Sequence, residues 1–143
     1  MTIFTTGYRC DAHGSLLRWL ERNSGVSVID VRFNPTPRDS RLSGERLRGT
    51  CPGRYQHLLS LTCAHVPSPG WPVRLDDPET GVLLARRIVA RGDVLLLGGA
   101  EDPSSCHRRE VAELLRTNLC PGARVVELTR DDLLGAPCLP GLE

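Results

Sequence analysis

Lysine is absent from this chain of 143 residues, because all 18 of its basic residues are arginine. Without lysine the protein cannot form a lysine Schiff base, and it lacks the lysine of an ordinary P-loop. Any anion that it binds must be met by arginine, by backbone N–H groups or by a metal. The formal net charge of +1 also excludes a polycation that binds nucleic acid through bulk charge alone.

Other absences narrow the class of protein further. No apolar run approaches the ~20 residues that span a bilayer, and we expect no membrane association. The opening stretch MTIFTTGYRC has no basic segment followed by a longer apolar one, so we expect no secretion signal. The six cysteines include no C-x-x-C pair, and we predict reduced thiols in a cytoplasmic protein. The length fits a single domain over 1–143, with 132–143 as a loosely held tail.

Apolar runs and helical repeats alternate along the chain. Strands are predicted at 2–8, 26–33, 94–100 and 123–128, and a short strand or turn at 55–61. Helices are predicted at 11–25, 80–93 and 103–119, and a short helix around 41–48. This alternation predicts an α/β fold, a three-layer Rossmann-like sandwich with a mainly parallel sheet.

Ligands of such sheets bind beyond the carboxyl ends of the strands. Tyr8 follows the first predicted strand, Asp30 and Arg32 end the second, and Glu101 precedes the last predicted helix. If the topology is as predicted, these side chains gather at one edge of the sheet. That convergence is the main sequence-based argument for a site.

The stretch IDVRFNPTPR carries the first motif. Asp30 and Arg32 are two residues apart, so they share one face of an extended strand. One can position or deprotonate a nucleophile while the other holds an anion, or the two can form a structural ion pair. Arg38 and further arginines of the following loop add positive charge that suits phosphate binding, or simply a solvated loop.

The stretch AEDPSSCHRR carries the second motif. Asp102 or Ser104 can cap the predicted helix, which places Cys106 in its first turn. Helix N–H groups with Arg108 can hold a phosphate, and His107 beside Cys106 favours a reactive thiolate. A small buried cysteine that packs under the turn is the structural alternative.

One group of neighbouring residues carries side chains that can bind zinc: Cys51, His57, Cys63 and His65. Their spacing matches no standard zinc site. We therefore predict neither a metal nor another cofactor.

Together these motifs resemble, in order, the sequence blocks of domain-of-unknown-function family 488, a bacterial and archaeal family. Its members typically carry Thr-Ile-Gly-Tyr, Asp-Val-Arg-x-x-Pro-x-Ser-Arg, Tyr-x-His-x-Pro-x-Leu-Gly-Gly and a final Cys-His-Arg. The matching stretches here are TTGY, DVRFNPTPR, YQHLLSL and GAEDPSSCHR, over about residues 3–116. Gly99 stands where the family often has a first cysteine, and LTC (61–63) replaces Leu-Gly-Gly. The resemblance implies nucleotide or nucleic-acid processing, including that of base-modified DNA.

We therefore predict a nucleotide- or nucleic-acid-directed hydrolase, with an N-glycosidic bond to a modified base as its first candidate substrate bond. A carboxylate, Asp30 or Glu101, would orient water or stabilise an oxocarbenium-like centre. Binding of the base and its flanking phosphates would fall to the remaining candidates: Tyr8, Arg32, Arg38, Tyr55, His57, Cys106, His107 and Arg108. Without lysine, such a glycosylase would be monofunctional.

Two alternatives remain open. The chain can be a non-catalytic module that binds a nucleotide or a modified base through the same residues. It can also be a thiol-dependent, sulfurtransferase-like enzyme that uses Cys106 as its nucleophile.

Overall fold

A computed structural model of the chain describes residues 1–7, 14–32, 42–62, 75–98 and 107–134. The strands are β1 (Thr2–Gly7), β2 (Ser27–Asp30), β3 (Tyr55–His57), β4 (Val94–Gly98) and β5 (Arg124–Glu127). The helices are α1 (Ser15–Arg22), α2 (Gly44–Thr50), α3 (Pro78–Ala90), α4 (Arg108–Leu119) and α5 (Arg130–Leu133), with a 3-10 turn, η3 (Leu59–Leu61). No helix in these segments is long and apolar enough to cross a membrane.

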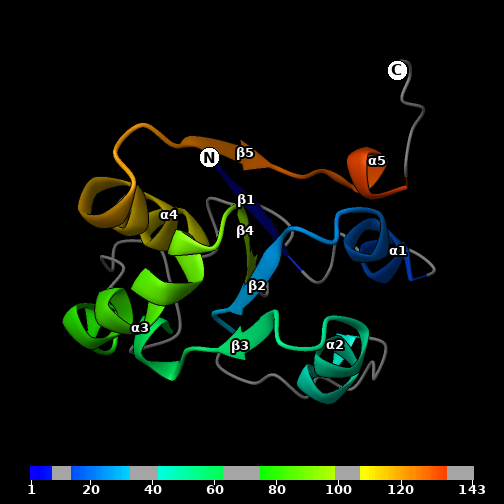
Figure 1. Cartoon of the computed structure of the whole chain (residues 1–143), viewed down its shortest axis with the longest axis horizontal. Coiled ribbons are helices and arrows are strands. Elements are labelled where there is room, and N and C mark those ends of the chain that lie inside the picture. Colours follow the sequence, from blue (N-terminus) through cyan, green and yellow to red (C-terminus); the bar gives the residue numbers. More distant parts are fainter. Residues whose placement is uncertain (8–13, 33–41, 63–74, 99–106, 135–143) are drawn as a thin grey trace, which may run out of the picture.

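The five strands form one sheet in the order β3-β2-β4-β1-β5, and every neighbouring pair is parallel. The chain first moves from β1 towards β3 and then returns through β4 to β5. Right-handed crossovers place helices on a face set by the direction of travel. Accordingly α1, α2 and α5 lie on one face of the sheet, and α3 and α4 lie on the other (Figure 1). The predicted three-layer, Rossmann-like α/β fold is confirmed.

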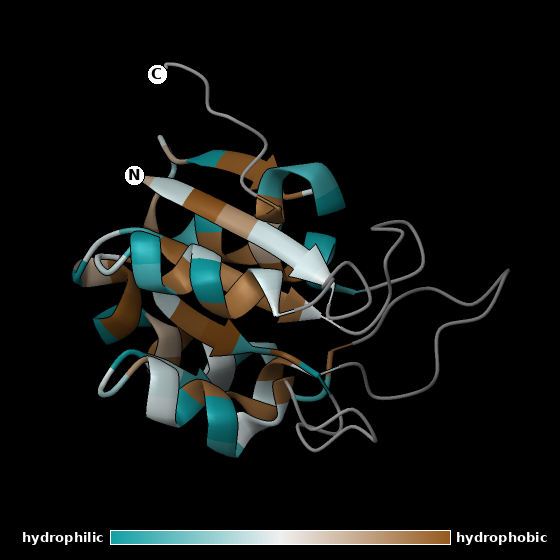
Figure 2. Cartoon of the chain, turned by 90° about the vertical axis from the view of Figure 1, so that its right-hand side faces the viewer, coloured by the Kyte–Doolittle hydropathy of each residue, from teal (hydrophilic) through white to brown (hydrophobic). Residues whose placement is uncertain are grey.

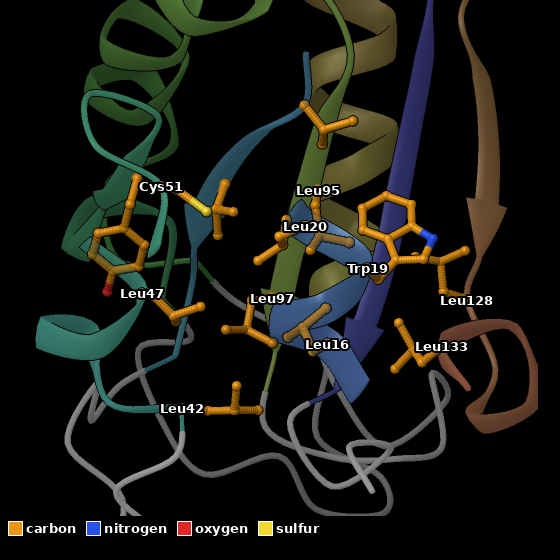
Figure 3. Packing of buried hydrophobic residues seen from close by; sticks show 13 residues of the cluster. Leu16, Trp19, Leu20, Leu42, Leu47, Cys51, Leu95, Leu97, Leu128 and Leu133 are labelled. Atoms are coloured by element: carbon orange, nitrogen blue, oxygen red, sulfur yellow. The ribbon is translucent and has the colours of Figure 1, made fainter. Parts of the chain in front are cut away.

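The central strands are buried because helices cover both of their faces. All residues of β2 and β4 are buried, which explains their nearly continuous apolar sequences. Figure 2 shows hydrophobic residues along the strands of the interior and hydrophilic residues on the helices that cover them. On the α1 side, Leu16 and Leu20 pack with Leu95 and Leu97 of β4 (Figure 3). On the same side the ring of Trp19 meets that of Phe4 edge-on, with 5.1 Å between their centroids.

Local signals explain where several helices begin. The Ser43 hydroxyl accepts a hydrogen bond from Arg46 N at 3.1 Å and caps α2. The Asp77 carboxylate caps α3 in the same way. By contrast, α1 begins after Gly14, whose φ of 75° lies in the left-handed region and which has no side chain to cap the helix.

Two predicted boundaries differ from the structure. The predicted loose tail began at residue 132, but α5 extends through Leu133, which is almost fully buried against the α1 side. The predicted last helix begins at residue 103, whereas α4 begins at Arg108, and the side chain of its N-cap residue, His107, does not cap it. The predicted caps Asp102 and Ser104 lie outside the described residues.

The direction of the crossovers identifies one special edge of the sheet. The connection that leaves β4 leads to the α4 face, whereas those that leave its neighbours β1 and β2 lead to the α1 and α2 face. Such a topological switch point is where open α/β sheets bind ligands. The carboxyl ends at this point are Gly7, Asp30 and Gly98.

Candidate functional site

Asp30, the last residue of β2, is fully buried at this edge. Its carboxylate accepts four hydrogen bonds. Arg32 donates to Oδ1 from its backbone N at 3.1 Å and from Nε at 2.9 Å. Oδ2 accepts from Arg32 Nη2 at 2.8 Å and from the Tyr55 hydroxyl at 2.7 Å. A buried carboxylate with this set of donors is well compensated for its loss of water.

Arg32 connects this carboxylate to the start of α2. Its side chain is only 3% exposed, and Nη2 also donates to the carbonyl of Leu42 at 2.7 Å. The planar guanidinium therefore joins the end of β2 to the segment that leads into α2. This geometry is that of the structural Asp–Arg pair, and it also fixes the path of the backbone at the site.

Tyr55 completes the network from the neighbouring strand. Val28 and Tyr55 are partners in the β2–β3 register, and the hydroxyl of Tyr55 reaches forward to Asp30. Burial, and then the hydrogen bond to Asp30, raise the pKa of the Tyr55 phenol well above its ordinary value. The ring is 9% exposed, and the guanidinium carbon of Arg48 lies 5.3 Å from its centroid. A base would have to displace Arg48 to stack on that face.

Two histidines hold the backbone just beyond β2. His57 Nε2 lies 2.6 Å from the carbonyl oxygen of Arg32, and His107 Nε2 lies 2.9 Å from that of Val31. These consecutive carbonyls point to opposite sides of an extended chain, towards β3 and towards β4. The two rings thus continue the hydrogen bonding of the sheet where its strands end. His57 is half-buried and His107 is buried.

Arg108, the first residue of α4, forms an ion pair with a residue of β5, the edge strand next to β1. Its Nη2 donates to Glu127 Oε2 at 2.7 Å, and the hydroxyl of Thr5 donates to Glu127 Oε1. Arg108 is fully buried, whereas Glu127 is 30% exposed. The ion pair joins the beginning of α4 to the end of the edge strand β5.

The structure thus brings together one group of the predicted site residues. Asp30, Arg32 and Tyr55 share a network, and His57 and His107 flank it through backbone carbonyls. Arg108 lies beside His107 in sequence, but its carboxylate partner is Glu127 on β5. The other predicted site residues lie outside the described part of the chain: Tyr8, Arg38, Glu101 and Cys106.

Sequence reasoning missed three members of this edge. The Leu42 carbonyl has no side-chain signal, so its bond to Arg32 was not predictable. Glu127 and Thr5 become partners only through the register of β1 with β5, in which they stand opposite each other. An acidic residue at the end of a predicted strand was the available signal for Glu127.

Among the described residues, neither cysteine nor metal chemistry receives geometric support at this edge. Within the described segments, no three His, Cys, Asp or Glu side chains gather as metal ligands would. Cys63 and His65 lie outside these segments. Cys51 is buried in the α1-side core, and burial raises the pKa of its thiol above the ordinary value. A thiol held neutral in this way is a poor ligand and a poor nucleophile.

The arrangement can fix one segment of backbone and present imidazole groups beside it. Asp30 has little capacity to activate water, because its four acceptor bonds are made and no part of it reaches solvent. Its predicted direct catalytic role stays a prediction, and the geometry supports a positioning role. The class that the fold and this edge define is a three-layer α/β domain with a buried Asp–Arg–Tyr network at its switch point. Comparisons with family models, curated proteins and solved structures found no match.

Proposed function

We propose that the chain is a nucleotide- or nucleic-acid-directed hydrolase whose ligand binds at the carboxyl edge of β2 and β4. The first candidate reaction is hydrolysis of an N-glycosidic bond to a modified base. The observation that carries the proposal is the coincidence of the topological switch point with the network of Asp30, Arg32 and Tyr55 and its two flanking histidines. The sequence resemblance to domain-of-unknown-function family 488 adds support for a nucleic-acid-related substrate.

The buried network would act as a rigid base for the site. A reaction at a sugar carbon needs groups held within a fraction of an ångström of the productive geometry, and side chains that are themselves locked provide this. Asp30 and Tyr55 lock Arg32, and the histidines lock the carbonyls that precede and follow its Cα. In this proposal Asp30 is a positioning residue.

The test is incubation with plain and base-modified DNA, single strands, free nucleotides and nucleosides, with released bases identified by mass spectrometry. Wild-type protein should release a base from at least one member of the panel. Asp30→Asn should lose at least tenfold in rate, because the amide weakens the grip on Arg32 and misplaces the site. Asp93→Asn is the matched control, since Asp93 binds Thr2 N at the opposite, amino edge of the sheet. Thermal unfolding establishes that each variant is folded.

No hydrolysis product from any member of the panel would refute the hydrolase. One observation favours a second candidate, a non-catalytic module that binds a nucleotide or modified base. The Asp30 carboxylate is fully buried and fully hydrogen-bonded, which suits a rigid binding scaffold as well as it suits an enzyme. Saturable binding to one member of the panel without turnover would establish that alternative.

A further inference from the structure

The hydrogen bonds of His57 and His107 determine which ring nitrogen can meet a ligand. A carbonyl oxygen only accepts, so each Nε2 must carry the hydrogen that it shares with Arg32 O or Val31 O. On a neutral ring, Nδ1 is then the nitrogen that carries no hydrogen. Within the described residues no hydrogen bond reaches Nδ1 of either ring. Protonation leaves both Nε2 bonds intact, because the imidazolium keeps its Nε2–H.

The charges of the edge make this proton significant. Arg32 is paired with Asp30, and Arg108 is paired with Glu127. These four groups sum to zero net charge, so neither arginine brings an uncompensated positive charge to a ligand. Histidine is the member of the network that can add one, since its charge changes between about pH 5 and 8.

His57 is better placed than His107 for contact with a ligand. His57 is half-buried, whereas His107 is 7% exposed. Among the described residues, the charged and titratable groups near His57 are Asp30 and Arg32 on the β2 side, and Tyr55 two residues earlier on β3. Arg48 of α2 lies over the Tyr55 ring, and η3, which follows β3, contains no ionisable residue. Asp30 and Arg32 neutralise each other, and Tyr55 stays uncharged because its pKa is raised.

We propose that the anionic group of the ligand binds His57 in its imidazolium form, so that anion binding at this edge takes up one proton at Nδ1. The proton comes from solvent, and no other bond changes. The inference rests on the proposed function, because the anion that it concerns is the phosphate of that nucleotide or nucleic-acid ligand. A neutral His57 offers only an acceptor at Nδ1, which repels a phosphate oxygen instead of donating to it.

Sulfate is the probe, because it keeps the same charge over the pH range used, whereas a phosphate monoester titrates near pH 6. Sulfate is titrated into the full chain at several pH values from about 5.5 to 8. Nuclear magnetic resonance of the ¹⁵N-labelled histidine rings monitors its binding and yields the affinity at each pH. Uptake of one proton weakens binding by up to about tenfold per pH unit once the free ring is neutral. Addition of sulfate near neutral pH should also protonate Nδ1 of His57.

His57→Gln is the decisive variant, because its amide can still donate to Arg32 O but has no nitrogen that titrates. We expect its sulfate affinity to be weak and independent of pH. His107→Gln is the matched control. It makes the same exchange at the other carbonyl, and its sulfate affinity should keep the wild-type pH dependence.

Four results would overturn the inference: no sulfate binding at any pH, a wild-type affinity that does not change with pH, a pH dependence that persists in His57→Gln, or a neutral His57 ring with its hydrogen on Nδ1. The last is read from the wild-type ¹⁵N spectrum, so it does not depend on whether a variant folds. Base release together with pH-independent sulfate binding would refute proton uptake at His57 and leave the proposed hydrolase intact. Proton-coupled sulfate binding without any hydrolysis would refute the hydrolase and leave proton uptake at His57 intact.

Discussion

At the scale of single residues, the Tyr55 hydroxyl is the donor to Asp30 that can be removed with the least change of shape. Tyr55→Phe keeps the ring and leaves Oδ2 with one donor, Arg32 Nη2. Loss of a buried hydrogen bond to a charged group should cost about 1.5–3 kcal/mol in the free energy of unfolding. Denaturant unfolding at neutral pH measures it, and an unchanged midpoint would show that the bond contributes nothing.

The same substitution has a pH dependence of known sign. The folded-state pKa of Tyr55 is raised above 10.0, its ordinary value in the unfolded chain. Below pH 10 the phenol is protonated in both states, and its full stabilisation is present. Above pH 10 the unfolded chain loses this proton first, so the stabilisation is lost as pH rises towards the folded-state pKa. The difference in unfolding free energy between wild type and Tyr55→Phe should therefore be constant below about pH 10 and shrink as pH rises above it. A difference that stays constant above about pH 10 would contradict the raised pKa.

Sequence predicted the residues of this network better than their roles. The two-residue spacing of Asp30 and Arg32 correctly placed them on one face. Spacing alone does not say whether a guanidinium contacts its neighbour or a ligand. The bidentate contact between the two side chains was therefore only one of two hypotheses. The carbonyl partners of the histidines were out of reach, since a backbone oxygen leaves no trace in the sequence.

At the scale of elements, Gly81 governs how closely α3 approaches η3. A Cβ at Gly81 would lie 2.2 Å from Leu61 Cδ2 and 2.5 Å from Leu61 Cγ, and Leu61 is fully buried. Gly81→Ala should therefore destabilise the fold by about 1–3 kcal/mol through overpacking, although alanine favours helices. In the control Gly49→Ala in α2, nothing lies within 4 Å of the new Cβ. That variant should gain up to about 1 kcal/mol. Thermal unfolding compares the two, and equal shifts would contradict the close approach.

The elements themselves were largely predictable, and their ends were not. Alternating apolar runs located β1, β2, β4 and β5 to within a few residues. The missed helix, α5, has only four residues and a capping box between Thr129 and Asp132. Its single buried leucine, Leu133, gives no helical repeat to detect. Such a short helix exists because tertiary packing buries that side chain, which a local pattern does not contain.

At the scale of the whole molecule, strand order was the unpredicted quantity with the greatest consequence. Alternation of strands and helices predicts a parallel sheet, but it does not say that β4 inserts between β1 and β2. That insertion creates the switch point, and it also leaves β5 at the edge. The edge strand is attached through β1 and through the ion pair of Glu127 with Arg108.

This attachment predicts a local response to loss of one charge. Glu127→Gln leaves the fully buried Arg108 without its carboxylate partner, which should cost about 3 kcal/mol, less the relief that the 30% exposure of Glu127 gives through water. Amide hydrogen exchange should accelerate at Leu128 N, which binds Thr5 O, and at the first turn of α4. The β2–β3 pairs, on the other side of β4, should keep their protection.

Glu113→Gln is the control, because Glu113 and Arg116 form an exposed ion pair within α4, which contributes little to stability. It also removes one negative charge, but from the exposed surface of α4 and without affecting β5. If both variants changed exchange equally, net charge and not the buried pair would be responsible. If Glu127→Gln instead accelerated exchange throughout the sheet, β5 and β2 would belong to one cooperative unit. The charge pair at the edge would then support the site network from across the molecule.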